Sequence, residues 1–248
     1  LKIAHEQFLR MLEDGQVTPI SFNIMLKEFL ANGYFDSALE LYEKVSKVLS
    51  PNIFIVNQMI EYYLHINAVP SAEQFLQQAM MLHPQVVPNL YTYNLLLSAY
   101  ARNSSKKKAE EIYKNILPAL RLIPDEGTYH AMLNLYSNIG YMQDAENFFN
   151  LLVNKEAIAY NSLMKAYVLR NKRIDKAEQL YNDMKANNID PTQHTFYTLL
   201  RGYIRVGKSS KAKEFVANEI QPFLKQRAMR MSAQLTEIVQ EVNNTSSR

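Results

Sequence analysis

One pattern of apolar positions recurs six times along the chain. Each copy opens on an aromatic residue or Val and the residue after it: Phe22-Asn23, Val56-Asn57, Tyr93-Asn94, Tyr129-His130, Tyr160-Asn161 and Phe196-Tyr197. Further apolar residues follow at three, four and seven positions, as Leu96, Leu97 and Tyr100 follow Tyr93. This spacing places them on one face of an α-helix, so the pattern predicts six helices.

A second apolar stripe follows each of these helices. It begins at an Ala sixteen residues after the opening position, or seventeen in the fifth copy: Ala38, Ala72, Ala109, Ala145, Ala177 and Ala212. Successive openings are 34, 37, 36, 31 and 36 residues apart. A helix pair of this length cannot bury its apolar faces alone, although it can do so by stacking on its neighbours. The predicted fold class is therefore all-α, an α-solenoid of about six helix-turn-helix repeats of 31–37 residues.

Glycine and proline residues mark the ends of the predicted helices. Gly33, Gly140 and Gly207 stand where a first helix should stop and the backbone should turn to positive φ. Prolines stand shortly before four of the openings, where the preceding helix must already have ended: Pro51, Pro88, Pro124 and Pro191. The local signals agree with the repeat length.

The spacing predicts one array over residues 1–248 with no domain boundary. Residues 1–18 fit the second helix of a partial repeat, 228–242 a terminal helix and 243–248 a disordered polar tail. The six repeats between them are 19–52, 53–89, 90–125, 126–156, 157–192 and 193–227. Because solenoids need polar caps, we expect the chain to be part of something longer, with any targeting peptide outside it.

Composition narrows the chemistry. The net charge of +3 and the pI near 8.8 permit a nucleic-acid partner without requiring one. The chain has no cysteine, which excludes disulfides and thiolate metal sites. No apolar run approaches the roughly 20 residues of a membrane span. The five His residues are scattered without i, i+4 pairing, so we expect no metal, no cofactor and no catalytic residue, and hence no enzyme.

Two copies carry a longer motif. The first is Tyr91-Thr-Tyr-Asn-Leu-Leu-Leu-Ser-Ala-Tyr100 followed by Lys108-Ala-Glu-Glu-Ile-Tyr113, and the second is Ala159-Tyr-Asn-Ser-Leu-Met-Lys-Ala-Tyr167 followed by Lys176-Ala-Glu-Gln-Leu-Tyr181. Over about residues 4 to 220 the chain resembles the pentatricopeptide repeat family. The tetratricopeptide alternative uses Trp as a landmark, and this chain has none.

The resemblance implies binding of single-stranded RNA, one base per repeat, read by two residues in each repeat. The implied pairs are Asn23 with Asn52, Asn57 with Asn89, Asn94 with Asp125, His130 with Glu156, Asn161 with Thr192, and Tyr197 with Arg227. The first three resemble pyrimidine readers, with uracil at the third repeat; the fourth and sixth fit no established pairing. The residues themselves support a reading role, because each Asn lies one position off the apolar stripe and its amide can both donate and accept.

The resemblance also implies residues that sandwich bases and residues that contact phosphates. The expected sandwiching residues are Ile20, Phe54, Tyr91, Ile158 and His194. Gly127 stands at that position in the fourth repeat and cannot stack, which makes this repeat the expected spacer. The expected phosphate contacts are Arg102 and Arg205, with Lys27, Lys165 and Arg201 one turn earlier. Each of these cations could equally belong to a solvated charged face.

Three functions are compatible with these features. The first is an RNA-binding factor in RNA processing, stability, splicing or translation, in the mitochondrial matrix by resemblance, or else in a chloroplast. The second is a protein associated with a mitochondrial ribosome or its assembly. The third is a helical scaffold that binds another protein through the same surface. The predicted partner is pyrimidine-biased single-stranded RNA, with the ribosome or RNA-processing proteins as further partners.

Overall fold

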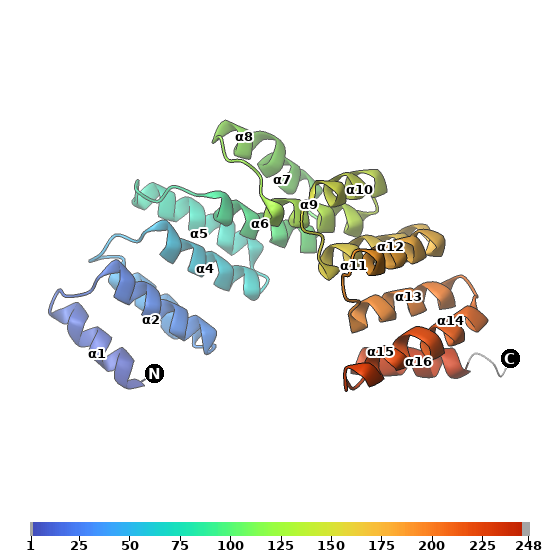
Figure 1. Cartoon of the computed structure of the whole chain (residues 1–248). Helices are drawn as coiled ribbons and strands as arrows, with labels where there is room; N and C mark the ends of the chain where they lie inside the picture. Colours follow the sequence, from blue (N-terminus) through green and yellow to red (C-terminus); the bar gives the residue numbers. More distant parts are fainter. Residues whose placement is uncertain (1, 245–248) are drawn as a thin grey trace. The chain divides into compact units, whose positions relative to one another are not determined.

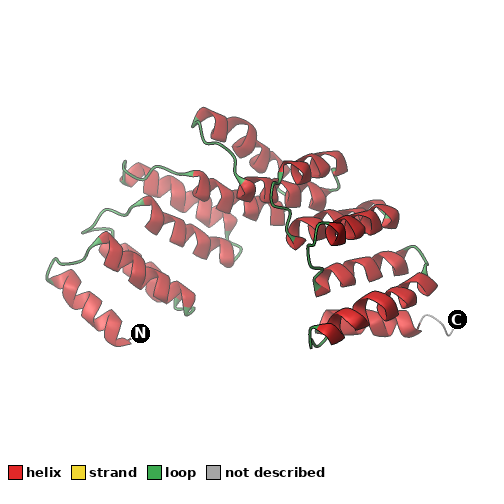
Figure 2. Cartoon of the chain, in the orientation of Figure 1, coloured by secondary structure: helices red, strands yellow, loops and turns green. Residues whose placement is uncertain are grey.

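The computed structural model describes residues 2–244, and every regular element in that range is helical (Figures 1 and 2). The first helices of the six repeats are α2 (Pro19–Ala31), α4 (Ile53–His65), α6 (Leu90–Arg102), α9 (Glu126–Ile139), α11 with the π-helical turn η2 (Ala157–Ala166 and Tyr167–Asn171), and α13 (Gln193–Arg205). Each begins at the first residue of a predicted repeat. The all-α prediction is confirmed for the described residues.

The second helices fill the other half of each repeat. They are α3 (Phe35–Val45), α5 (Val69–Leu82), α7 with η1 and α8 (Lys106–Glu111, Ile112–Ile116 and Leu117–Ala119), α10 (Met142–Leu151), α12 (Ile174–Ala186), and α14 with η3 and α15 (Ser209–Phe215, Val216–Ile220 and Gln221–Gln226). A partial repeat stands at each end: α1 (Lys2–Glu13) and α16 (Ala233–Asn244).

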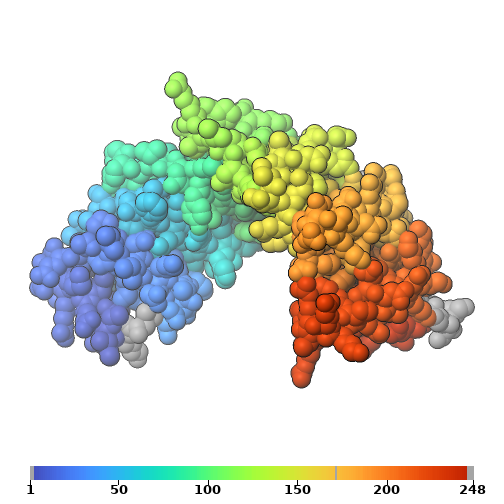
Figure 3. All heavy atoms as spheres, viewed as in Figure 1, coloured from blue at the N-terminus to red at the C-terminus, as the bar shows by residue number. Residues whose placement is uncertain are grey.

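The helices group into two compact units. The first unit holds residues 1–100 and 107–124, and the second holds 101–106 and 125–248. In the first unit α2 packs on α4, and in the second α9, α11, α13 and α16 pack in sequence. Second helices lie against their own first helices, as α3 does on α2, α5 on α4 and α10 on α9. Side chains fill the spaces between the helices within each unit (Figure 3). Nothing in the repeat spacing predicts the division into two units.

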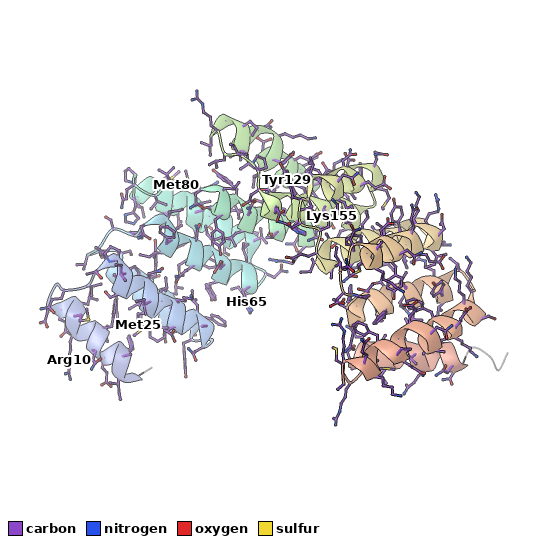
Figure 4. The ribbon with its side chains drawn as sticks, viewed as in Figure 1. Arg10, Met25, His65, Met80, Tyr129 and Lys155 are labelled. Carbon is purple, nitrogen blue, oxygen red and sulfur yellow. The ribbon has the colours of Figure 1, made fainter. Side chains whose placement is uncertain are left out.

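Five of the six opening residues are buried in the core, as the apolar stripe predicts, while Tyr129 is half-buried. Phe22 and Phe196 stand at equivalent positions in the two units, and both are fully buried. In the first unit, Phe22 joins Met25, Leu26 and neighbours from α1, α3 and α4 in one apolar cluster. Figure 4 labels Met25 on α2 and Met80 on α5; the first is buried and the second is exposed. Packing between adjacent helices therefore supplies most of the stability of each repeat.

The turn between the two helices of each repeat contains a left-handed residue. Gly33, Gly140 and Gly207 have φ of 75°, 83° and 73°, as predicted. Asn67, Ser104 and Lys172 occupy the same place in the other three repeats, with φ between 52° and 59°. Non-glycine residues tolerate this conformation at some cost, so a glycine search finds only half of the turns.

Two details differ from the predicted boundaries. The terminal helix begins at Ala233 rather than at residue 228, and it continues through Asn244 into the predicted tail; residues 245–248 lie outside the described range. The seventeen-residue spacing of the fifth repeat coincides with η2, a π-helical turn at the end of α11. A π turn accommodates one extra residue, which explains why the Ala of this copy follows the opening position by seventeen residues and not by sixteen.

Candidate nucleic-acid interface

The second residue of the first five predicted reading pairs lies at the start of a first helix, whereas Arg227 lies at the end of α15. Asn52 caps α4 by accepting from the backbone N–H of Ile55 at 3.1 Å, and Asp125 caps α9 by accepting from that of Thr128 at 2.9 Å. Thr192 caps α13 in the same way, through the N–H of Thr195 at 3.3 Å. Short polar side chains satisfy the free N–H groups of a helix start. These positions therefore have a structural role in addition to any reading role.

The capping hydroxyl of one repeat also holds the reading Asn of the repeat before it. The Thr92 hydroxyl lies 2.8 Å from Asn57 Oδ1 and 3.1 Å from Asn89 Oδ1, so it links the two members of that pair. In the second unit Thr195 donates to Asn161 Oδ1 at 2.7 Å, and Asn161 Nδ2 donates to Thr192 at 3.1 Å. The structure thus brings both predicted pairs together.

Asn57 and Asn161 are more enclosed than their sequence pattern predicts. They are 3% and 7% exposed, although a position off the apolar stripe is expected to be more accessible to solvent. Their carbonyl oxygens are fixed by Thr92 and Thr195, which orients the amide groups. In Asn161 the NH2 group is also engaged, whereas no hydrogen bond is formed by that of Asn57 within the described residues.

In the first repeat a glutamine side chain, and not a threonine hydroxyl, holds the reading Asn. Ile55 stands where Thr92 and Thr195 stand in their repeats, so no capping hydroxyl is available to Asn23. Instead, Gln58 Nε2, one turn further along α4, donates to Asn23 Oδ1 at 2.6 Å. The Oε1 atom of Gln58 is buried and has no partner among the described residues. Sequence reasoning missed Gln58, although the absence of a Thr at position 55 was visible.

A pocket of about 420 Å³ in the first unit gathers these groups. Its walls include six residues predicted for reading, stacking or phosphate contact: Asn23, Asn57, Asn89, Phe54, Tyr91 and Lys27. Gln58 and Glu61, which the sequence pattern did not single out, complete it. Amides, two aromatic rings and a cation therefore converge on one space, as recognition of a nucleotide requires.

Glu61 fixes one of the aromatic rings of this pocket. The Tyr91 hydroxyl donates to Glu61 Oε1 in a short hydrogen bond. That bond, followed by partial burial and the nearby negative charge, raises the pKa of Tyr91 to about 12. The phenol therefore stays neutral at physiological pH and remains hydrogen-bonded to the carboxylate, which limits rotation of the ring.

The predicted sandwiching residues are exposed to solvent. Ile20, Phe54, Tyr91 and Ile158 all leave more than half of their surface accessible, which is unusual for large apolar side chains. His194 lies on the same register of α13, where its ring stacks on Tyr197 at 6.2 Å between centroids. Partial burial, and then the positive charge of Lys165, lower the pKa of His194. The free edges of these side chains can contact a ligand.

Among the described residues, no capping hydroxyl links the two members of the fourth or of the sixth predicted reading pair. Glu156 stands at the start of α11 without forming a side-chain cap, and Gly127 has no side chain to stack. Arg227 pairs with Asp190 at 2.6 Å and lies 4.6 Å above the Phe223 ring, while Tyr197 stacks on His194. The other fourth-repeat residue, His130, is partly buried on α9. Asn94 is partly buried on α6.

The predicted phosphate contacts fall into different surroundings. Lys27 lines the first-unit pocket, whereas Lys165 and Arg205 line a separate pocket in the second unit. Arg102 is exposed at the end of α6. Arg201 has a carboxylate partner on α16, because its Nη1 lies 3.6 Å from Glu241 Oε2. Its charge is thus partly compensated within the protein.

No group of three or more His, Cys, Asp or Glu side chains in residues 2–244 could hold a metal ion. No helix in the same range is both long enough and apolar enough to cross a membrane.

Family models match most of the repeats. The PPR repeat family model covers residues 155–205, the pentatricopeptide repeat domain model 81–139, and the PPR repeat model 20–47, 127–156 and 194–217. Together with the stacked helix pairs, these matches show that the chain belongs to the pentatricopeptide repeat family.

Curated and solved relatives agree with this assignment. A pentatricopeptide repeat-containing protein of Arabidopsis thaliana is 26% identical over 178 residues, which are 71% of this chain and 29% of that protein. The small ribosomal subunit protein mL103 of the same plant is 19% identical, over 72% of this chain and 52% of its own. The pentatricopeptide repeat protein PPR10, solved with an 18-nt psaJ RNA element, superposes with a TM-score of 0.76 at 20% identity, over 100% of this chain and 35% of that one. This likeness confirms the α-solenoid fold class.

The chain is shorter than these relatives. It spans between 20% and 29% of the length of the first relatives that it matches.

Proposed function

We propose that this chain binds single-stranded RNA in a sequence-selective way, through the faces of its first helices. The observation that carries the proposal is the first-unit pocket, in which the residues predicted for base reading and stacking lie together: Asn23, Asn57, Asn89, Phe54 and Tyr91. The PPR10 structure contains RNA, and this chain shares its fold. Stacking on aromatic residues contributes roughly 1 to 3 kcal/mol per base.

The orientation of the amides suits the pairing edge of a base in this pocket. Thr92 holds Asn57 Oδ1, so the NH2 group of Asn57 is the atom left to donate to a base. Gln58 also lines this pocket, and its buried Oε1, which has no partner among the described residues, is an acceptor that a small rotation of the amide would present. The pairing edge of every base presents a donor beside an acceptor, so these two groups suit a base edge, while the preference for pyrimidines is what the family resemblance implies. By resemblance, the chain reads pyrimidine, pyrimidine, U, any, pyrimidine, any, with the 5′ base at the amino end.

A binding assay with three ligands tests the proposal. The ligands are an oligonucleotide with the proposed site, its purine-substituted version, and a duplex of the proposed site. We expect tightest binding to the single-stranded pyrimidine ligand, since a duplex cannot present unstacked bases to the rings. Equal affinity for all three ligands would contradict sequence-selective binding and favour the protein scaffold.

The proposed compartment is an organelle. Several relatives carry mitochondrial names and one carries a chloroplastic name. A role in the mitochondrial matrix, in processing, stability, splicing or translation of a transcript, follows from the same resemblance. Imaging of the full-length protein with organelle markers, followed by sequencing of its crosslinked RNA, tests both points.

The similarity to mL103 favours a second candidate, in which the chain holds RNA as part of a ribosomal particle. The two candidates differ in the size of the complex that contains the protein. Sedimentation of an organelle extract separates them, since a ribosomal protein moves with a ribosomal subunit and a transcript-specific factor does not.

A further inference from the structure

The turns that join successive repeats of the first unit carry exposed apolar side chains. These turns follow α3, α5 and α8, and their large apolar residues are 48% to 83% exposed: Val48, Met81, Leu82, Val87, Leu120 and Ile123. We call this set the apolar edge. None of its residues lines the pocket proposed to receive a base. Single exposed apolar residues are ordinary, whereas a group of them on neighbouring turns marks an interaction surface.

The three turns lie next to one another. The side-chain amide of Gln85 donates to the backbone carbonyl of Pro51 at 3.4 Å, which joins the first turn to the second. Lys108 on α7 forms an ion pair with Glu73 on α5 at 2.7 Å, so the second helices of the second and third repeats are also neighbours. The connections that lead into α4 and α6 and the end of α8 lie on the same border of this unit (Figure 1). The apolar edge is therefore one surface.

Cations accompany the apolar edge, and carboxylates do not. The three turns fall within segments of the sequence that contain no Asp and no Glu, namely 44–60, 74–109 and 112–124. Lys47 and Arg121 are exposed on the first and third turns, and neither forms an ion pair with any described residue. The edge thus combines apolar side chains with uncompensated positive charge, and it complements an anionic partner.

The equivalent turns of the second unit have a different character. Val153, after α10, is 85% exposed, but Glu156 follows it three residues later. On the next turn Asp190 is exposed and pairs with Arg227 at 2.6 Å. Because carboxylates stand on these turns, the combination of apolar surface and free positive charge is particular to the first unit.

The degree of exposure indicates which anionic partner fits. Side chains that line a groove shield one another, whereas Met81 and Ile123 are 81% and 83% exposed and therefore project from the turns. Projecting apolar side chains suit a fluid partner that closes around each of them, as the acyl chains of a lipid layer do. A second copy of the chain suits the edge less well, since symmetric pairing would bring two positively charged surfaces together.

We propose that the apolar edge binds the surface of a membrane that contains anionic lipids. Met81, Ile123 and their apolar neighbours enter the boundary between headgroups and acyl chains, while Lys47 and Arg121 contact the lipid phosphates. This inference goes beyond the proposed function and does not depend on it, because the edge and the base pocket share no residue. A chain attached in this way keeps its pocket available for RNA.

Flotation of the whole chain with vesicles tests the proposal. The vesicles contain phosphatidylcholine alone or phosphatidylcholine mixed with phosphatidylglycerol, and we expect the wild type to float with the mixed vesicles. Ile123→Ser should reduce this binding about tenfold, and Lys47→Gln about fivefold. Val153→Ser, the matched control in the second unit, should reduce it less than about twofold. All three positions are exposed, so the melting temperature should not change.

A fluorescent residue shows whether the edge itself enters the lipid. The chain contains no Trp, so Ile123→Trp introduces a single reporter. Its emission should shift to the blue with mixed vesicles and be quenched by brominated lipids, whereas Val153→Trp should show neither effect. Attraction of other cations of the chain to the vesicles would give flotation without the blue shift, and this result would overturn the proposal.

The same reporter identifies the other possible occupants. A blue shift that needs no vesicles and grows with protein concentration would show a contact between two copies, and the proposal would be wrong. It would also be wrong if an acidic amphipathic peptide shifted the emission and vesicles did not, because the edge would then receive a protein segment. A chain that floats but binds no RNA would refute only the proposed function, and a chain that binds RNA but does not float would refute only this inference.

Discussion

The two pockets place opposite charges at equivalent positions of a repeated helix. Four residues beyond Asn57, the first-unit pocket has Glu61, whereas four residues beyond Asn161 the second-unit pocket has Lys165. Three residues before the same Asn positions stand Phe54 and Ile158. One pocket combines aromatic rings and amides with a carboxylate, while the other combines cations with a hydroxyl. The same fold therefore lines one pocket with groups that suit a base and the other with groups that suit an anion.

The reading residues differ between the units as well. Asn57 keeps its NH2 group free of protein partners within the described residues, while Asn161 donates to Thr192. A base that approaches Asn161 must first displace that bond, which reduces the net gain from pairing. Base selectivity should therefore be stronger in the first unit than at the fifth repeat.

The largest expected effect concerns the stability of each unit by itself. Phe22→Ala and Phe196→Ala remove equivalent, fully buried rings, and each should destabilise its own unit by about 3 to 5 kcal/mol. Because solenoid repeats contact mainly their neighbours, hydrogen exchange of the other unit should change much less. Amide exchange followed by mass spectrometry measures this directly. Equal loss of protection in both units after either substitution would show that they unfold as one.

A smaller effect is expected at the third repeat, where Asn94 and Asp125 form the predicted uracil-reading pair. Asp125→Asn should relax the preference from U toward C, and Asn94→Thr should shift it toward a purine. The changes should be of order 1 to 3 kcal/mol, by analogy with base-edge contacts in DNA. Four oligonucleotides that differ only at the third base measure the preference. Asp125 also caps α9, so melting curves must accompany the assay; an unchanged preference in folded variants would contradict the assigned pair.

Reversing the charges of Lys165 and Glu61 tests whether these charges give the two pockets different roles. Lys165→Glu should weaken RNA binding by about 2 kcal/mol, because it places a carboxylate among the remaining cations. Glu61→Lys should strengthen binding and increase its salt dependence, at about −0.7 per added phosphate contact on a single strand. It should also free Tyr91, whose hydroxyl Glu61 accepts. Titrations at several salt concentrations measure both effects, and equal responses to the two substitutions would show that the pockets do not differ in role.

The smallest effect is expected from Gln58→Leu. This change removes the bond to Asn23 and the unpaired acceptor, so the two losses should nearly cancel in stability. Discrimination between pyrimidines and purines at the first and second bases should fall by about 1 kcal/mol. Competition between two labelled oligonucleotides is sensitive enough to detect this. Gln179→Leu, at an exposed position on α12, is the matched control, and an effect of equal size there would contradict a specific role for Gln58.

The starts of the helices, their buried faces and their capping residues were predictable from the sequence, because neighbouring residues determine them. Helix starts follow from prolines and capping residues, and the stripes that begin at Phe22 and Phe196 define which face is buried. The capping role of Asn89 was also visible, since Thr92 stands three residues later, as in a capping box. These signals depend on a few adjacent residues.

The remaining features depend on how helices rotate against each other. The placement of Ser137 and Arg170 in one pocket depends on how α9 packs on α11 and on the extra residue in η2. The seventeen-residue spacing indicated an insertion without showing where the chain accommodates it. Burial of Asn57 and Asn161 arises from a hydroxyl of the next repeat, which no pattern within one repeat can reveal.

The bond from Thr92 to Asn57 has a consequence for engineering new specificities from this scaffold. The amide that would select a base in one repeat is oriented by a residue that is counted as part of the next. A transplanted segment that ends at residue 89 leaves the orienting Thr behind. Exchangeable segments should therefore be cut within a second helix, so that each selecting residue travels together with the hydroxyl that orients it.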